Sequence, residues 1–202
     1  MGTGKSTIVT DLASHLGFKA WPERVADNPF FTRFLDGKAE WAFCSQAAFL
    51  INASEDAANA RGEGVGGVLE RPPEEMLGVF VRTLAEDEFL NPQEVRLLTE
   101  LVALSERLSG VPDVLVVLRA TPETLLERIR ARGATDKHAY SPGDLEQLSK
   151  AYDRWISDWT RSPVLEVDVE TRDLRDPGEM TRLAEEVRET LAGRGVKALS
   201  RE

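Results

Sequence analysis

Short apolar runs separated by longer amphipathic stretches form the main pattern of this chain. The clearest run, residues 113–118, reads DVLVVL and predicts a strand buried on both faces, because its apolar residues are not interrupted by polar ones. Weaker runs predict further strands at residues 18–21, 68–69 and 164–169. Strands that alternate with helices indicate an α/β fold in which helices flank a parallel sheet.

Helices are predicted between these strands from apolar spacing and from residues that favour helix ends. The first is expected to stop at Gly17, since glycine readily adopts the left-handed conformation that ends a helix. Asn28 and Asn91, each followed by proline, open two others, because asparagine caps helices and proline suits the first turn. The predicted helices cover residues 5–16, 28–37, 39–60, 74–86, 93–108, 121–132 and 144–159, and a last one ends near residue 191.

Composition narrows the class of protein. Hydrophobic residues make up 42% and charged residues 30% of the 202, which is typical of a soluble globular chain. The formal net charge of −10 disfavours nucleic-acid polymers and anionic membranes as partners, whereas a nucleotide needs only a few local cations. Cys44 is the single cysteine, so an internal disulfide is excluded and a reducing cytoplasm is expected. We expect one domain over residues 1–202, with a tail that frays from about residue 192.

The first residues read as the second half of a phosphate-binding loop, G-x-x-x-x-G-K-S/T. Glycine lets backbone N–H groups approach phosphate oxygens, and the start of the following helix adds positive potential. Lys5 can reach the β- and γ-phosphates, and the Ser6 hydroxyl can ligate Mg²⁺. A flexible N-terminus that contains Gly-Lys-Ser by chance is the alternative. The expected nucleotide-binding residues of the loop are Gly2, Thr3, Gly4, Lys5, Ser6 and Thr7.

The first glycine of this motif, and the strand that delivers the loop, would lie before Met1. That strand is central in sheets of this type, so its loss would expose the edges of neighbouring strands and open the core. We therefore expect that the sequence begins too late and that the first strand of the fold is missing from it.

Four segments beyond the loop form an ordered set. They are residues 23–30 (ERVADNPF), 40–46 (EWAFCSQ), 70–71 (ER) and 118–133 (LRATPETLLERIRARG). In order and spacing the set resembles the deoxynucleoside kinases, especially the bacterial deoxyadenosine and deoxyguanosine kinases, over nearly the whole chain. The resemblance implies a three-layer P-loop fold with a short lid at about residues 133–142.

The resemblance also assigns an acceptor side. It implies that Glu23 accepts the proton of a sugar 5′-hydroxyl, that Gln46 reads a nucleobase edge and that the ring of Phe80 lies against the base. The alternatives are a solvated surface glutamate, an ordinary polar helix position and a core phenylalanine. Trp41 and Phe43 are expected to pack in the core.

Glu70 and Arg71 match the acidic-Arg pair of the family. The resemblance implies that Arg71 holds the acceptor oxygen or stabilises phosphoryl charge, and that Glu70 assists Mg²⁺ through water. The alternative is a salt bridge at a strand end. Pro72 stands where the family has serine, which puts the local backbone geometry in question.

Three arginines resemble those of the family lid that closes over the triphosphate: Arg128, Arg130 and Arg132. The alternative is a charged, solvated helix face. The chain departs from the family at Leu35, Ala53 and Ala134, where a sugar-binding tyrosine, a frequent arginine and a lid arginine are expected. The sugar pocket and the donor clamp are therefore expected to be altered.

Taken together, the resemblance implies an enzyme that uses Mg²⁺ and ATP to phosphorylate the 5′-hydroxyl of a deoxynucleoside, with a purine preference. One alternative is a nucleoside monophosphate kinase of the thymidylate kinase kind. Another is a catalytically impaired partner subunit. The resemblance further implies a homodimer, or a heterodimer with a related subunit, formed through long helices.

Overall fold

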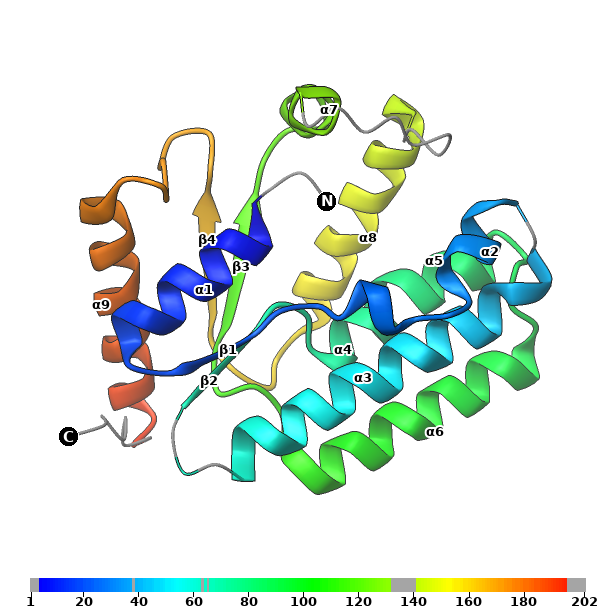
Figure 1. Ribbon diagram of the computed structural model, residues 1–202, viewed down its shortest axis with the longest axis horizontal. Helices are drawn as coiled ribbons and strands as arrows, with labels where there is room; N and C mark the ends of the chain where they lie inside the picture. The colour runs from blue at the N-terminus through cyan, green and yellow to red at the C-terminus, as the bar shows by residue number, and fades with distance from the viewer. Residues whose placement is uncertain (1–3, 38, 63, 65, 132–140, 196–202) are drawn as a thin grey trace.

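The computed structural model describes residues 4–37, 39–62, 64, 66–131 and 141–195, and these form a helix-rich α/β fold (Figure 1). Its strands are β1 (Lys19–Trp21), β2 (Gly67–Leu69), β3 (Leu115–Arg119) and β4 (Val164–Asp168). In this part of the chain β1 pairs with β2 and β3 pairs with β4, both in parallel. The predicted parallel α/β class is confirmed.

The helices follow the predicted order, with small changes of boundary. Two 3₁₀ turns, Val25–Asp27 and Ala39–Trp41, precede α2 and α3, so that these helices begin later than predicted. No helix within the described ranges is long and apolar enough to cross a membrane. The helices are α1 (Lys5–Leu16), α2 (Phe31–Leu35), α3 (Ala42–Gly62), α4 (Pro73–Glu75), α5 (Arg82–Glu86), α6 (Pro92–Ser109), α7 (Pro122–Ala131), α8 (Pro142–Asp158) and α9 (Pro177–Gly193).

Local capping explains why the helix ends were predictable. Gly17 has φ 73° and ends α1, as a left-handed glycine does. At the start of α6, the Asn91 side chain accepts from the backbone N–H of Glu94, whose carboxylate accepts from the backbone N–H of Asn91. Ser141 and Asp144 form the same reciprocal pair at α8. These contacts satisfy N–H groups that a helix leaves unpaired.

Helices cover both faces of the β3–β4 pair. Val116 and Leu118 of β3 pack toward α1 and α9, which lie side by side, whereas Leu115 and Val117 pack toward α8 (Figure 1). This alternation is the pleat of a strand buried on both faces, as residues 113–118 predicted. A second cluster joins α3 and α6 and includes Phe49, Leu50, Leu98 and Val102.

A cavity of about 450 Å³ separates the two strand pairs. Residues 66–70 of the β2 side and residues 114–120 of the β3 side line it, and α1 and α8 supply further wall residues. Among the described residues, the edges of β2 and β3 that face this cavity have no strand partner. We call it the strand slot.

The predicted helix over residues 74–86 is not regular. It starts as α4, continues as a π-helix at Met76–Val81 and ends as α5. Gly78 lies against Trp155 of α8 so closely that a Cβ atom on it would be 2.1 Å from the Trp155 Cδ1 atom. The π-helix inserts extra backbone into the helical ladder at this close contact, and such bulges are frequent at functional sites.

Candidate functional site

Helix α1 presents the described part of the expected phosphate loop. Gly4 has φ 83°, a left-handed conformation that glycine adopts without strain, and Lys5 opens the helix. Ser6 and Thr7 are exposed in the first turn. Gly2 and Thr3 lie outside the described residues. The start of this helix lies beside the end of β2, because the Ser6 hydroxyl contacts Glu70, and backbone N–H groups at a helix start suit an anion.

Glu70 connects the loop to the acceptor segment. It follows β2, and its backbone N–H donates to the carbonyl oxygen of Trp21 at 2.9 Å, which extends the β1–β2 pairing by one bond. Its Oε1 accepts from the Ser6 hydroxyl at 3.0 Å, and its Oε2 accepts from the backbone N–H of Glu23 at 3.1 Å. One carboxylate thus joins the start of α1 to the segment after β1.

Arg71 is held between two carboxylates. Its side chain is 7% exposed, and its Nε lies 3.0 Å from Glu23 Oε1 while its Nη1 lies 3.0 Å from Glu75 Oε1. The guanidinium also lies 4.4 Å from the ring centroid of Phe80. Burial opposes the charge of Arg71, but the surrounding negative charges, Glu75 first, outweigh it and raise its pKa. Arg71 is therefore a fixed, permanently charged group beside Glu23.

Lys5 belongs to the same cluster of charges. Burial lowers its pKa and the charge of Arg71 lowers it further, whereas the carboxylates of Glu75, Glu23 and Glu70 raise it. Lys5 therefore shares its electrostatic surroundings with Glu23, Glu70 and Arg71. A lysine with a lowered pKa and free space in front of it gains a counter-charge when a phosphate binds.

Two oxygen groups in the site fit a magnesium ion. Mg²⁺ is usually held by one or two protein oxygens together with substrate phosphates and water. Ser6 and Glu70, which are in direct contact at 3.0 Å, offer a hydroxyl and a carboxylate beside the phosphate loop. Within the described ranges, no group of three or more His, Cys, Asp or Glu side chains forms an alternative metal centre.

The segment after β1 is fastened to α3 at both of its ends. Arg24 donates to the Asn52 carbonyl oxygen at 3.0 Å and to Glu55 at 2.9 Å, and it pairs with Asp56 at 3.1 Å. Asn28 is buried and donates to the Ser45 carbonyl oxygen at 3.0 Å. Glu23 directly precedes the first of these anchors, and its own backbone N–H is bound by Glu70, so its position is fixed from both sides. Sequence reasoning identified Asn28 as a helix opener and missed its role as an anchor.

A cavity of about 20 Å³ opens beside Glu23 and Arg71. Phe49 and Ala53 of α3 line it, and Gln46 lies one turn earlier on the same helix face. Gln46 is 5% exposed, and its Oε1 is buried without a hydrogen-bond partner. A buried amide oxygen without a partner is costly unless a ligand satisfies it. Met76 adds a further apolar wall.

The structure shows where three of the residues that depart from the family pattern lie. Pro72 is extended, with φ −76° and ψ 154°, and leads into α4 without displacing Arg71 from its partners. Ala53 is buried in the wall of the cavity, and Leu35 ends α2. Ala134 lies outside the described residues. Phe43 packs against the α3–α6 core cluster, whereas Trp41, also expected in the core, is only partly buried and stacks on Phe30.

The expected lid arginines are only partly placed. Arg128 donates from Nη2 to the Val169 carbonyl oxygen at 2.9 Å, which ties α7 to the segment after β4. Arg130 is exposed, and Arg132 lies outside the described residues, as does most of the expected lid at residues 133–142. The structure therefore brings together Ser6, Glu23, Glu70, Arg71 and Phe80, with Gln46 on the neighbouring helix face, whereas the described contact of Arg128 is to Val169.

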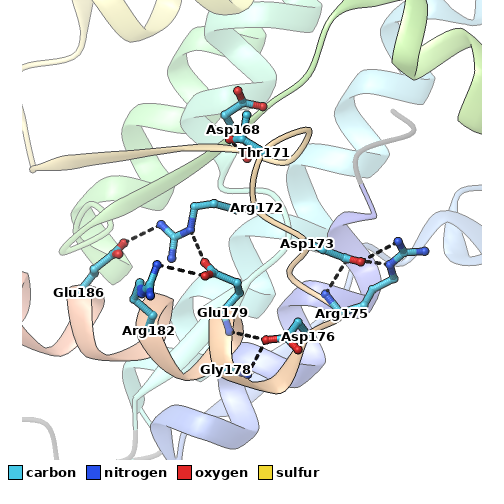
Figure 2. A network of polar contacts seen from close by, with 10 residues as sticks. All are labelled: Asp168, Thr171, Arg172, Asp173, Arg175, Asp176, Gly178, Glu179, Arg182 and Glu186. Carbon is cyan, nitrogen blue, oxygen red and sulfur yellow. Dashed lines mark hydrogen bonds and ion pairs between the residues drawn. The ribbon is translucent and has the colours of Figure 1, made fainter.

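Sequence reasoning missed a polar network in the segment between β4 and α9, which Figure 2 shows. Arg172 donates to Glu179 at 2.9 Å and to Glu186 at 3.1 Å, and Arg175 forms two bonds with Asp173. Asp176 caps α9. The Asp176-Pro pair is the local signal that could have located this cap. The network fixes a loop at the carboxyl end of β4, the side of a parallel sheet where ligands bind.

Glu74, beside Glu75, gives a prediction about pH. It is 6% exposed, and burial raises its pKa from 4.5 to about 7. The folded chain therefore holds this proton over a range in which the unfolded chain has released it, so stability falls as pH rises from about 4.5 to about 7. We expect Glu74→Gln to remove this pH-dependent loss. As the pH rises from 4.5 to about 7, its free energy of unfolding should rise relative to that of the wild type by about 3 kcal/mol.

Urea unfolding at pH 5 and pH 8 measures the effect. Glu100→Gln, at a side chain that is 64% exposed, is the control and should follow the wild type at both values. An equal gain for Glu74→Gln at the two pH values would contradict the assignment of this titration to Glu74.

The arrangement defines a class of protein before any comparison. A phosphate-loop helix, parallel strands and a cluster of cations and carboxylates at the carboxyl ends of two strands are the features of a P-loop kinase.

The chain belongs to the deoxynucleoside kinase family, whose sequence pattern it matches over residues 1–192. It is 31% identical over 176 residues to deoxyadenosine/deoxycytidine kinase of Bacillus subtilis (strain 168), a match that covers 86% of this chain and 81% of that relative. It is 24% identical over 196 residues to deoxyguanosine kinase of the same organism, covering 95% and 94%. The family resemblance and the kinase class predicted from the sequence are confirmed, and the chain is a nucleoside-phosphorylating enzyme.

Solved structures agree on the fold. Deoxyadenosine kinase from M. mycoides, determined with dCMP and a flexible dCDP bound, superposes with a TM-score of 0.77 at 20% identity and covers 94% of this chain and 95% of its own. A second structure of that kinase, with dCTP bound, gives a TM-score of 0.72 at 19% identity, again over 94% of this chain and 95% of its own. At such identity the likeness concerns the fold.

Proposed function

We propose that this chain transfers the γ-phosphoryl group of ATP to the 5′-hydroxyl of a deoxynucleoside, with a preference for purines. The observation that carries the proposal is the contact of Glu23 with Arg71 at 3.0 Å, in the same charge cluster as Lys5 and Glu70. Such a cluster pairs a carboxylate that can take a proton with cations that can take phosphoryl charge.

Each residue has a role in this proposal. Lys5 and the backbone N–H groups of residues 2–7 hold the donor phosphates, and Ser6 and Glu70 hold Mg²⁺, which neutralises charge on the phosphates when bound. Gln46 and Phe80 receive the base. We assign Arg128, Arg130 and Arg132 to the donor triphosphate, whose charge guanidinium groups can stabilise.

The reaction requires one proton transfer and one displacement. The 5′-hydroxyl oxygen attacks the γ-phosphorus, and its proton passes to a Glu23 carboxylate oxygen. The bond between the γ-phosphorus and the bridging oxygen breaks, and ADP keeps that electron pair. Charge on the transferred group lies near Lys5 and Arg71 in the transition state. Rigid positioning of these two cations supplies most of the stabilisation in a reaction of this type.

The local charge favours a neutral acceptor over a nucleotide. Glu23, Glu70 and Glu75 surround Arg71 and Lys5, so the carboxylates outnumber the cations. A deoxynucleoside brings no charge into this cluster, whereas a monophosphate would bring about two negative charges at neutral pH. This disfavours the thymidylate kinase alternative. The retained contacts of Ser6, Glu23 and Arg71 likewise favour an active enzyme over an impaired partner subunit.

A phosphate-transfer assay tests the proposal directly. Labelled γ-³²P-ATP and Mg²⁺ are supplied with each of the four deoxynucleosides and, separately, each of the four deoxynucleoside monophosphates. We expect label on deoxynucleosides, most on deoxyadenosine and deoxyguanosine, in line with the names of the relatives. Transfer to monophosphates alone would overturn the acceptor assignment. Preference for deoxycytidine or thymidine would overturn the purine preference. Absence of both phosphate transfer and nucleotide binding would indicate that the chain is a catalytically impaired partner subunit.

We also propose that the chain forms a dimer through α6 and the adjoining α3. Leu97, Leu104 and Leu108 are 47%, 46% and 70% exposed, and their spacing places them on one face of α6. An exposed apolar stripe of this kind marks an interaction surface. Two copies that meet along it would cover each stripe with the other.

The variant Leu104→Lys places a charge in the middle of this stripe. We expect it to weaken self-association at least tenfold, because burial of an unpaired lysine is unfavourable. Sedimentation of the wild type and the variant over a range of concentrations measures the effect. Thr99→Lys adds the same charge about 140° around the helix from Leu104 and should leave the dimer intact. A wild type that stays monomeric at 100 µM would refute the dimer.

A further inference from the structure

A buried carboxylate and a part-buried tyrosine near Arg71, Glu75 and Tyr152, have no role in the reaction described above. Glu75 is 7% exposed at its side chain and lies on α4, next to the π-helix. The hydroxyl of Tyr152, on α8, donates to Glu75 Oε1, the same oxygen that pairs with Arg71 Nη1. A tyrosine from a helix far along the chain therefore completes the surroundings of the arginine.

The geometry divides the guanidinium between two carboxylates. Glu75 takes Nη1 and leaves Nε to Glu23, each at 3.0 Å. Arginine prefers a bidentate pair, in which two N–H groups bind both oxygens of one carboxylate. With Glu75 removed, Arg71 is free to turn and form such a pair with Glu23. Both oxygens of the proposed base would then be engaged, and the base would be less available for the substrate proton.

Tyr152 fixes Glu75 in the position that this division needs. Its ring packs edge-on against Phe80 and Trp155, with ring centroids 6.4 Å and 6.3 Å away. Trp155 in turn fits against Gly78, where a side chain would collide with it. Helix α8 thus packs directly against the π-helix, and this packing restricts the motion of the Tyr152 hydroxyl away from Glu75. Removal of a buried hydrogen-bond donor leaves its acceptor unsatisfied.

We propose that Glu75 and Tyr152 are positioning residues that orient Arg71 toward Glu23 for phosphoryl transfer. The proposal rests on the proposed function for its kinetic meaning. A positioning role differs from a purely stabilising one, because an ion pair that only stabilised the fold would leave the turnover of the folded enzyme unchanged. The proposal also orders the two residues: Tyr152 acts on Arg71 mainly through Glu75.

Kinetics of Glu75→Gln, Tyr152→Phe and the double variant provide the first test. We expect kcat to fall about 10- to 100-fold for Glu75→Gln, the range that misplacement of a catalytic group produces, and less for Tyr152→Phe. The KM for ATP should stay within about twofold. The double variant should match Glu75→Gln alone, because residues acting in one chain of contacts are not additive. Glu74→Gln, an adjacent buried glutamate without a contact to Arg71, is the matched control and should keep its kcat.

A spectroscopic test separates this proposal from the proposed function. The chain has two tyrosines, Tyr140 and Tyr152, so Tyr140→Phe leaves Tyr152 as the single reporter. In that background, the ¹³Cζ resonance of labelled tyrosine should move on Glu75→Gln and stay in place on Glu74→Gln. The test needs no substrate, so it stands even if no nucleoside is phosphorylated.

The outcomes are distinct. A resonance that ignores Glu75→Gln, or kcat losses that add in the double variant, would overturn the positioning role. Full turnover in folded Glu75→Gln would overturn it as well. If the resonance shifts but the chain phosphorylates no nucleoside, the proposed function is wrong and the contact between Tyr152 and Glu75 is still supported.

Discussion

Replacement of Glu23 by glutamine is expected to lower kcat for deoxynucleoside phosphorylation by about 10²- to 10⁴-fold, the usual contribution of a general base. Glutamine keeps the shape of the side chain and removes its ability to accept the hydroxyl proton. Arg71 keeps its second carboxylate partner, Glu75, so the buried cation is not left unpaired and the fold should survive. Initial rates at saturating ATP and nucleoside measure the effect, and the affinity for Mg-ATP should remain within about twofold.

The matched control is Glu55→Gln. Glu55 also pairs with an arginine of the same segment, Arg24, but its side chain is 58% exposed and it lines neither cavity. Its loss should change kcat by less than about twofold, as expected of a surface pair. Turnover of Glu23→Gln within about threefold of the wild type would remove Glu23 from the role of base.

A strand supplied to the strand slot is expected to raise the melting temperature by about 10 °C. We would join five alternating valine and isoleucine residues to the N-terminus through a short glycine-containing link. Such a strand can bond to the facing edges of β2 and β3 and cover apolar walls on both sides, which suits an unbroken apolar run. A net gain of about 4 kcal/mol is reasonable from the area covered, and 1 kcal/mol shifts the melting temperature of a chain this size by about 2–4 °C.

Calorimetry measures the melting temperature, and hydrogen exchange of the β2 and β3 amides reports the new bonds. An extension of equal length with a central proline is the control, because proline removes an N–H donor and is excluded from central strands. If the apolar extension melts no higher than the proline control, the cavity does not accept a strand.

The helices were largely predictable because their end signals are local. Gly17 and the Asn91–Glu94 pair act within a few residues, so sequence alone fixed these boundaries closely. The π-helix was not predictable, since apolar spacing presumes a regular helical period. The π-helix includes the contact of Gly78 with Trp155, and no local pattern reveals that pair.

Some residues of the candidate site could likewise be predicted from local sequence, and others could not. Lys5, Glu23, Glu70 and Arg71 stand in segments that carry recognisable motifs, and the structure brings them together. Glu75 and Tyr152 carry no motif, and they meet across 77 positions of sequence. Their contact depends on how α8 packs on the π-helix, which is a property of tertiary packing. The arginines of the expected lid follow a clear sequence pattern, but only Arg128 has a described contact, to Val169.

The register of β1 and β2 limits how chain length can vary between homologues. Trp21 is opposite Leu69, and Glu23 and Arg71 each follow two positions later. One residue inserted in either short interval would displace one partner by about 3.3 Å along its strand, more than the length of their ion pair. Insertions in the turns before Lys19 or Gly67 leave these intervals intact. In active relatives we therefore expect insertions and deletions before β1 and β2, and a constant number of residues between the end of each strand and the glutamate or arginine that follows it.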